Sequence, residues 1–341
     1  MQKLRVAVIG LGRMGLIHVQ SLARYINKAK LVACSDIDIE RASKCAKEWG
    51  IPKVTSNPLE VLADPDVDAV VISTPTSTHA ELIYAAAEYR KHVFCEKPVA
   101  ATLDEVNNIL KIVTQKEIKL MVGFQRRFDP NFQYAYKMIK SGRVGKIWLL
   151  RITSRDPVPP PLGYIQTSGG LFLDMTIHDF DMARFLVGDE VREIYAYGNA
   201  LINPQIKEAG DIDTAVCVMI FRNGVIGVID NARQAVYGYD QRVEVLGSKG
   251  MLSVGNPYLH YVTLWTDEGH HGARLMEFFT DRYITAYVRE LEEFVETILA
   301  DRDPPVSALD CKIAMVMAYA AQRSLLERRP VRLSEIDPSL G

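Results

Sequence analysis

The chain of 341 residues carries a formal net charge of −2, with 48% hydrophobic and 24% charged residues. This length suits two domains, and the composition is that of a globular protein with a large core. Paired arginines stand only at 126–127 and 328–329, so the charge pattern argues against nucleic acid as a partner. No apolar run reaches the roughly 18 residues that a membrane-spanning helix needs, so we expect no membrane association.

Cysteine usage favours a reducing compartment. The five cysteines are scattered and show no C-x-x-C spacing; they are Cys34, Cys45, Cys95, Cys217 and Cys311. This pattern is typical of buried thiols in the cytoplasm and not of a disulfide framework. Strand-forming sequence begins at Leu4, which leaves no room ahead of it for a signal peptide. We therefore expect a soluble, cytoplasmic protein.

Residues 1–122 alternate between short apolar runs and amphipathic stretches. The runs predict strands at 5–9, 31–34, 69–72, 92–95 and 119–122. Stretches 80–89 and 103–113 have helical spacing, and Thr102 with Glu105 has the pattern of a capping box. Continuous apolar strands separated by helices predict an α/β domain whose parallel sheet is buried on both faces.

A glycine-rich run, Gly10-Leu11-Gly12-Arg13-Met14-Gly15, follows the first strand and opens a helix. In dinucleotide-binding sites the first glycine makes a tight turn and the second lets the backbone approach the pyrophosphate. The third lets helix and strand pack closely. The spacing alone would also fit a merely tight turn. In this context it predicts a doubly wound Rossmann domain over residues 1–122, with Gly10, Gly12, Arg13, Met14 and Gly15 at the cofactor.

Asp36 ends the second predicted strand, about 20 residues after the glycines, where an acidic side chain binds the adenosine ribose hydroxyls. A carboxylate there repels a 2′-phosphate, and Asp38 and Glu40 add to the repulsion. The nearest cation, Arg41, falls on the following helix. The pattern predicts NAD rather than NADP; the alternative is a solvated loop aspartate.

The strand 69–72 is followed by Ser73, Thr74, Pro75 and Thr76. Because strand C-termini line the ligand crevice of doubly wound sheets, this segment is expected to border the nicotinamide. His79 either contacts substrate or cofactor there or is only a first-turn residue of the next helix.

Residues 123–341 have a different pattern. Helices are predicted at 132–139, 171–186, 283–300 and 309–327, and strands at 146–153, 193–198, 214–221, 225–231, 241–246 and 261–265. Consecutive strands divided by tight turns favour a mostly antiparallel, open sheet, hence a second domain of α+β type.

Two motifs fit the oxidation of an alcohol. That reaction needs a cation to stabilise the developing alkoxide and a base to take the proton. Lys97, in Glu96-Lys97-Pro98 after strand 92–95, can be that cation, although alone it would be read as an exposed loop lysine. His178 suits the base, with Asp174 one helical turn earlier.

Other interpretations of this pair stay open. Asp174 could be a helix N-terminal aspartate and His178 a core histidine. Asp179 and Asp181 also neighbour His178. The Asp-x-x-x-His spacing could suggest a metal, but no third ligand is evident, and 270–271 looks like a surface-loop histidine doublet. We predict no metal.

Taken together, these motifs resemble the Gfo/Idh/MocA oxidoreductases and, within them, the inositol 2-dehydrogenases. The resemblance runs end to end, and the closer one rests on segments 123–129, 155–157, 211–215 and 230–242. It implies that Lys97, Asp174 and His178 form the catalytic set, with His178 as base and Lys97 contacting the reacting hydroxyl, and that Glu96 lies at the cofactor.

The resemblance also implies a substrate site and an assembly. It places Arg127, Asp156, Tyr237 and Tyr283 in the pocket for a cyclic polyol, and it implies a homotetramer formed through the open sheet face. The expected reaction is NAD-dependent oxidation of myo-inositol to 2-keto-myo-inositol (scyllo-inosose). The alternatives are scyllo-inositol, chiro-inositol or a pyranose sugar, or a non-catalytic NAD-binding regulator; the loop 158–164 leaves substrate choice open.

Overall fold

The computed structural model describes residues 3–340, and its contacts form two units. One comprises Met1–Phe128 and Thr285–Ile313, the other Asp129–Ile284 and Ala314–Gly341. This grouping differs from the predicted division after residue 122, because the long helix α11 (Ile284–Leu299) returns to the N-terminal part of the chain. Phe294 of α11 packs edge-on against Phe94, with ring centroids 5.8 Å apart. Helical periodicity shows that such a helix has an apolar face, but not which sheet that face covers.

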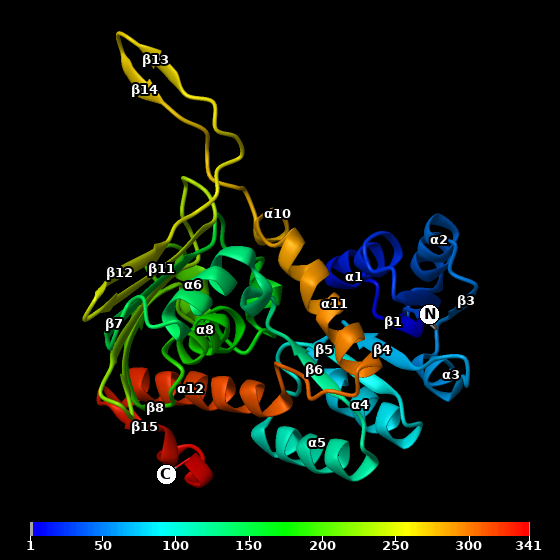
Figure 1. The fold of residues 1–341 in the computed structure, drawn as a ribbon. Coiled ribbons are helices and arrows are strands. Elements are labelled where there is room, and N and C mark those ends of the chain that lie inside the picture. The colour runs from blue at the N-terminus through cyan, green and yellow to red at the C-terminus, as the bar shows by residue number, and fades with distance from the viewer. Residues whose placement is uncertain (1–2, 341) are drawn as a thin grey trace. The chain divides into compact units, whose positions relative to one another are not determined.

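The first unit is built on a six-stranded parallel sheet with strand order β3-β2-β1-β4-β5-β6. Its strands are β1 (Leu4–Ile9), β2 (Ala29–Ser35), β3 (Lys53–Thr55), β4 (Ala69–Ile72), β5 (His92–Glu96) and β6 (Leu120–Gly123). Its helices include α1 (Arg13–Arg24), α2 (Ile39–Trp49), α3 (Pro58–Ala63), α4 (His79–Glu88) and α5 (Leu103–Lys116). Helices α1 and α11 lie on one side of the sheet and α4 and α5 on the other (Figure 1). This order confirms the predicted Rossmann sheet. Only β3 was not expected, because this short edge strand contains no buried residue.

The predicted capping box opens α5. Thr102 Oγ1 accepts a hydrogen bond from the backbone N–H of Glu105 at 3.2 Å, and Glu105 Oε2 accepts from the backbone N–H of Thr102 at 2.9 Å. Both N–H groups would otherwise lack a partner within the helix.

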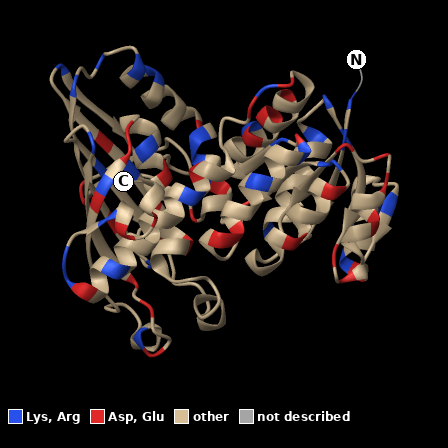
Figure 2. Ribbon diagram, turned by 90° about the horizontal axis from the view of Figure 1, so that it is seen from below, with Lys and Arg blue, Asp and Glu red and all other residues tan. Residues whose placement is uncertain are grey.

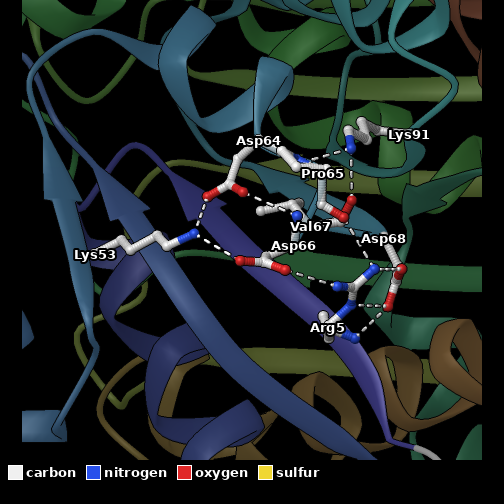
Figure 3. Close-up of polar contacts among 8 residues, drawn as sticks. All are labelled: Arg5, Lys53, Asp64, Pro65, Asp66, Val67, Asp68 and Lys91. Carbon is white, nitrogen blue, oxygen red and sulfur yellow. Dashed lines mark hydrogen bonds and ion pairs between the residues drawn. The ribbon is translucent and has the colours of Figure 1, made fainter.

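Charged side chains at the amino edge of this sheet join its strands to the loop before β4 (Figure 3). Arg5 donates to both carboxylate oxygens of Asp68, from Nε at 3.0 Å and from Nη2 at 2.7 Å. Buried Lys91 donates to the carbonyl oxygens of Asp64 and Val67, each at 2.7 Å. Burial acts to raise the pKa of Asp68, but the bonds from Arg5 outweigh it and leave that pKa below its ordinary value. Ligands of doubly wound sheets bind at the opposite, carboxyl edge, so we assign this network a structural role.

The second unit is built on a seven-stranded sheet with strand order β12-β11-β7-β10-β9-β8-β15. Its strands are β7 (Ile147–Arg155), β8 (Val191–Asn199), β9 (Thr214–Phe221), β10 (Ile226–Ala232), β11 (Asp240–Gly247), β12 (Gly250–Val254) and β15 (Val331–Arg332). Its helices include α6 (Pro130–Lys140), α7 (Leu162–Ile165), α8 (Ile177–Val187), α9 (Pro204–Glu208), α10 (Phe279–Arg282) and the C-terminal part of α12 (Ala308–Glu327). Strands β7 and β10 pair in parallel and the other neighbours antiparallel, which confirms the predicted mostly antiparallel sheet.

Helices cover only one face of this sheet. Helices α6, α8 and α12 lie on that side (Figure 1), where the alternate β9 residues Ala215, Cys217, Met219 and Phe221 are buried. The other face exposes large apolar side chains, which are Tyr195, Tyr197, Val216, Ile226, Leu246 and Met251. We call this surface the open face. A contiguous apolar surface of this kind is typical of an interaction site.

Strands β13 (Leu264–Thr266) and β14 (Gly269–His271) pair only with each other. Their hairpin extends away from the seven-stranded sheet (Figure 1). The sequence placed a strand at 261–265 among the sheet strands and the histidine doublet 270–271 in a loop. The structure differs on both points, because an alternating pattern identifies a strand without identifying its partner.

Lys and Arg residues are interspersed with Asp and Glu residues in both units (Figure 2). This mixture matches the near-neutral net charge of the sequence. Over residues 3–340, no helix has both the length and the apolar character that crossing a membrane requires.

Candidate active site

A tight glycine turn joins β1 to α1 at the carboxyl edge of the first sheet. Gly10 has φ +90°, and a Cβ there would lie 2.8 Å from backbone atoms of Ser73 and Thr74. A Cβ on Gly15 would lie 1.9 Å from the carbonyl oxygen of Gly10, so only glycine allows this packing of helix on strand. Gly12 has open space at its Cβ position. It is the N-cap of α1, whose first two residues are Arg13 and Met14, and no side chain caps this end of the helix. This cradle fits the pyrophosphate of a dinucleotide.

Asp36 follows β2 and is 7% exposed. Its Oδ2 accepts a hydrogen bond from the backbone N–H of Leu11 at 2.7 Å, and its Oδ1 accepts from that of Asp38 at 2.9 Å. Arg41 Nη1 lies 3.3 Å from Asp36 Oδ1. The carboxylate of Asp36 lies where the ribose is expected, and it also stabilises the glycine turn through its hydrogen bond to Leu11. The spacing of Asp36 from the glycines predicts the first role but not the second.

The segment after β4 lies against the glycine turn. Ser73 Oγ donates to the carbonyl oxygen of Gly10 at 2.8 Å, and Thr78 Oγ1 donates to Thr74 Oγ1 at 2.7 Å. Pro75 precedes the short 3-10 helix η1 (Thr76–Thr78). The segments predicted to contact the cofactor thus meet at one edge of the first unit.

His79 is 1% exposed and lies between two loops of this edge. Its Nδ1 lies 2.8 Å from the carbonyl oxygen of Pro98, and its Nε2 lies 2.8 Å from that of Thr74. Burial lowers the pKa of His79, while the two carbonyl oxygens act in the opposite direction. His79 is the first residue of α4 (His79–Glu88), as one of the two interpretations expected, and its ring also joins two backbone segments. Contact of His79 with substrate or cofactor stays a prediction.

Lys97 directly follows β5, the strand that pairs with β4. It is half-buried, and its peptide bond to Pro98 is cis. The preceding residue, Glu96, places its Oε1 2.7 Å from Nε2 of the buried His18. The ammonium group is therefore carried by a segment that α1 and α4 hold from two sides.

In the second unit, Asp174 lies in a cluster of charged and hydroxyl groups. Its Oδ2 accepts a hydrogen bond from Arg233 Nη1 at 3.1 Å, and its Oδ1 accepts from the hydroxyl of Tyr164 at 2.7 Å. Arg233 is 1% exposed, and its Nη2 lies 3.6 Å from Asp211 Oδ2. Burial, together with Asp174, raises the pKa of Tyr164, so the phenol keeps its proton and acts as a donor.

A glycine pair and a π-helical turn shape the segment that carries Asp174 and His178. Gly169 and Gly170 have φ +83° and +85°. The π-helix η3 (Phe172–Thr176) follows and leads into α8, where a regular helix over 171–186 was expected. Such turns are frequent at functional sites. Asp174 and His178 are both partly exposed while the three residues between them are buried, so they share one accessible face.

The two alternative carboxylates near His178 do not share that face. Asp179 and Asp181 are 0% and 1% exposed. Asp179 Oδ2 accepts a hydrogen bond from Asn231 Nδ2 at 2.8 Å, and Asn231 Oδ1 accepts from the hydroxyl of Thr176 at 2.7 Å. Of these three carboxylates, only that of Asp174 is partly exposed, as His178 is.

The residues expected around a polyol differ in their burial and in their partners. Asp156 is half-buried after β7, near enough for its charge to raise the pKa of Tyr164, which burial also raises. Tyr283 is fully buried, with its ring centroid 6.1 Å from that of Tyr239. Asp156 is therefore near Tyr164 of the Asp174 cluster, whereas Tyr283 packs in the core against the ring of Tyr239.

Arg127 and Tyr237 are held by other protein groups. Arg127, in the first unit, donates from Nη2 to Asp310 Oδ1 at 2.9 Å. Tyr237 donates to Asp240 Oδ2 at 2.8 Å and accepts from Arg155 Nη1 at 3.0 Å. Both side chains therefore have a structural role in addition to the one that the resemblance implies.

No role was expected for Arg233 or Tyr164, although both hold Asp174. Arg233 directly follows β10, and Tyr164 lies in α7 within the loop whose function the sequence left open. Burial of an arginine depends on carboxylates that are distant in the chain, so no local pattern indicates it.

Comparison with known proteins extends these observations. Residues 4–124 match an oxidoreductase family with an NAD-binding Rossmann fold, and residues 132–253 match the GFO/IDH/MocA C-terminal domain. The chain is 46% identical to myo-inositol 2-dehydrogenase of Thermotoga maritima, covering 98% of this chain and 99% of that protein. It is 42% identical to inositol 2-dehydrogenase of Rhizobium meliloti, over 97% and 99% of the two chains.

A solved structure shares the whole fold. The crystal structure of scyllo-inositol dehydrogenase from Lactobacillus casei with bound NAD(H) and scyllo-inositol has a TM-score of 0.92 and 30% identity, covering 98% of this chain and 100% of that one. The chain described here belongs to the Gfo/Idh/MocA family of oxidoreductases, with an NAD-binding Rossmann domain at its N-terminus.

Proposed function

We propose that the protein is an inositol 2-dehydrogenase that oxidises myo-inositol to 2-keto-myo-inositol (scyllo-inosose) with NAD. The observation that carries the proposal is the pair of accessible groups, Asp174 and His178, on one face of a π-turn, with Asp174 held by Arg233 and Tyr164. The names of the relatives from Thermotoga maritima and Rhizobium meliloti supply the substrate class.

The reaction removes a hydride from the carbinol carbon and a proton from its oxygen. NAD, when bound, accepts the hydride at the carboxyl edge of the first sheet. His178 accepts the hydroxyl proton through an unprotonated ring nitrogen, and Lys97 stabilises the negative charge that develops on oxygen. Asp174 orients the imidazole or accepts a hydrogen bond from a second hydroxyl. Convergence of Lys97 and His178 on one hydroxyl is part of the proposal.

A ring with six hydroxyl groups needs many paired donors and acceptors in its site. Arg127, Asp156, Tyr237 and Tyr283 are proposed for this role from the family resemblance. The Asp174 cluster adds a hydroxyl that the sequence did not suggest, that of Tyr164, whose oxygen can accept a hydrogen bond while its proton is donated to Asp174.

Oxidation of scyllo-inositol is the second candidate. It is favoured by the structural likeness to the Lactobacillus casei enzyme, whose name specifies that isomer. The isomers differ in the orientation of a single hydroxyl, and the hydroxyl oxygen of Tyr164, in the loop 158–164, is an acceptor for which that orientation matters.

Initial rates with NAD on a polyol panel test the proposal. We expect kcat/KM to be highest for myo-inositol, lower for scyllo-inositol, chiro-inositol and glucose, and negligible for sorbitol, with scyllo-inosose identified as product by mass spectrometry and NMR. NADP should be the poorer cofactor, because the side chain of Asp36 stands where a 2′-phosphate would bind. Activity on open-chain polyols alone would refute the ring substrate, and better use of NADP would refute the cofactor assignment.

We further propose that the protein assembles as a homotetramer in the cytoplasm. The open face supports assembly, because its exposed apolar side chains gain from leaving water. The five cysteines are all buried and form no disulfide with one another, which suits a reducing compartment.

Light scattering during gel filtration is expected to give a mass about four times the 38.3 kDa of one chain. Tyr197 and Val216 are cross-strand partners on the open face, so replacing both with glutamate should dissociate the assembly through charge burial. Tyr134→Glu is the matched control, because Tyr134 is an exposed aromatic residue on α6. A monomeric wild type, or a double variant of unchanged mass, would contradict assembly through this face.

A further inference from the structure

Three ionisable side chains meet inside the first unit, beneath the segment that carries Lys97. They are His18 of α1, Glu96 of β5 and Glu290 of α11, and one ligand atom of each lies within 4.8 Å of those of the other two. His18 and Glu290 are fully buried, and both carboxylate oxygens of Glu290 lack a hydrogen-bond partner within residues 3–340. Such a group must hold a proton or contact another ligand, because an isolated buried carboxylate is strongly unfavourable.

The geometry determines where the protons of this cluster reside. His18 Nε2 is 2.7 Å from Glu96 Oε1, whereas its Nδ1 has no hydrogen-bond partner among the described residues. A protonated Nδ1 would be a buried donor without an acceptor, so the geometry places the ring proton on Nε2, which donates to Glu96 Oε1. A second carboxylate beside Glu96 would then be repelled by it. Burial, and next the charge of Glu96, raise the pKa of Glu290 well above its ordinary value.

The surroundings of the cluster favour a neutral Glu290. The ring of His18 packs edge-on against Phe94 and Tyr287, with centroids 5.3 and 6.3 Å away. Tyr287 is the titratable residue of α11 whose ring contacts His18, and its hydroxyl accepts a hydrogen bond from Gln125 at 3.3 Å. The charge of Glu96 also acts on His79 of α4, whose pKa it raises against the larger effect of burial. Gly123 leaves room for Glu96, because a Cβ there would lie 3.1 Å from Glu96 Oε2.

We infer that Glu290 is a protonated carboxylic acid that, with His18, holds Glu96 in place and thereby positions Lys97. In this inference the proton of Glu290 faces the Glu96 carboxylate across the cluster, whose ligand atoms lie within 4.8 Å of one another, so Glu96 has α1 on one side and α11 on the other. Helix α1 begins at the pyrophosphate cradle, and the cluster therefore joins that helix to the end of β5. Glu290 and His18 are positioning residues and do not touch substrate. The role of Lys97 in this inference rests on the proposed function.

A divalent cation is the competing occupant. Two ligands of one tetrahedral zinc lie roughly 3.3 Å apart, given metal–ligand bonds of about 2.0 Å. The 2.7 Å separation of His18 Nε2 and Glu96 Oε1 is shorter than that and is a hydrogen-bond length. The geometry therefore favours a proton over a metal.

Infrared spectroscopy of the full-length protein in heavy water tests the proton directly, without substrate. Wild type at neutral pH should show the C=O stretching band of a protonated carboxyl, and Glu290→Gln should lack it. Glu292→Gln is the matched control, because Glu292 is exposed on the same helix, and it should retain the band. The inference would be overturned if wild type lacked the band or if Glu290→Gln retained it. It would also be overturned if wild type contained a stoichiometric metal that Glu290→Gln loses.

Kinetics test the positioning role. Glu290→Gln keeps the volume and a neutral donor, so kcat should stay within about threefold of wild type. Glu290→Leu keeps the volume but removes the donor, and we expect a kcat lower by about 10- to 100-fold with the KM for NAD little changed.

Raising the pH should remove the infrared band of the wild type and lower the kcat of the wild type together, while the glutamine variant keeps its rate. Equal rates for the leucine and glutamine variants would show that the proton does not position Lys97, even with the band present. Failure of the inositol assignment would change the substrate used in these assays but not the infrared result.

Discussion

Replacing His178 with alanine is expected to lower kcat by about 10²- to 10⁴-fold, the usual contribution of a positioned general base. Without the imidazole, the hydroxyl proton must pass to water, which is a much weaker base. Binding of NAD should be unchanged, because the glycine cradle and Asp36 belong to the first unit, whereas His178 lies in the second. Stopped-flow formation of NADH and fluorescence titration with NADH measure the two quantities separately.

The matched control for this variant is His270→Ala, which removes an exposed histidine of the β13–β14 hairpin. It should leave kcat and KM unchanged. An essential base makes kcat/KM fall on the acidic side of the pH profile. This fall should disappear in the His178 variant and persist in the control. Unchanged turnover without His178 would remove it from the mechanism and would favour the alternative of a non-catalytic NAD-binding protein.

Replacing Arg233 with methionine is expected to impair both folding and turnover. Arg233 is fully enclosed and stands between Asp174, at 3.1 Å, and Asp211, at 3.6 Å. Its loss leaves two partly buried carboxylates without their cation, and breaking a buried pair in this way costs about 3–5 kcal/mol of unfolding free energy. Asp174 would also lose the hydrogen bond that Arg233 donates to its Oδ2. Urea denaturation measures the stability, and initial rates measure the turnover.

A compensating variant separates stability from catalysis. Combining Arg233→Met with Asp174→Asn and Asp211→Asn removes all three charges together, and replacement of a whole buried ionic group is often close to neutral for stability. We expect the triple variant to regain most of the lost stability while its kcat stays low, because Asp174 is no longer ionised. If the triple variant recovered wild-type turnover, Asp174 would have no part in the reaction as a charge.

Local patterns in the sequence predicted much of the first unit. The apolar runs match five of its strands because strands buried on both faces need continuous hydrophobic sequence. The capping box at Thr102 and the glycine turn were readable because they require particular residue types at fixed offsets. The exposed edge strand β3 has neither property and was not expected.

The sequence was less informative about long-range contacts. It identified Asp174 and His178 as neighbours on a helical segment, but it showed neither the π-turn that carries Asp174 nor the arginine and tyrosine that hold it. It offered two roles for His79, but it did not show that the ring's partners are carbonyl oxygens of two separate loops. The helix at 283–300 was predicted, but its association with the first sheet was not.

By itself, the sequence determined five strands of the first sheet and the long helices, where the dinucleotide cradle lies, and which lysine, aspartate and histidine are the candidates for chemistry. These features depend on residue type and on spacing along a few turns of chain. Only the tertiary structure decided that Arg233 and Tyr164 hold Asp174, and that Glu290 reaches His18 and Glu96 from a helix nearly two hundred residues away. Burial of a charge depends on partners brought together by folding, and local periodicity carries no information about them.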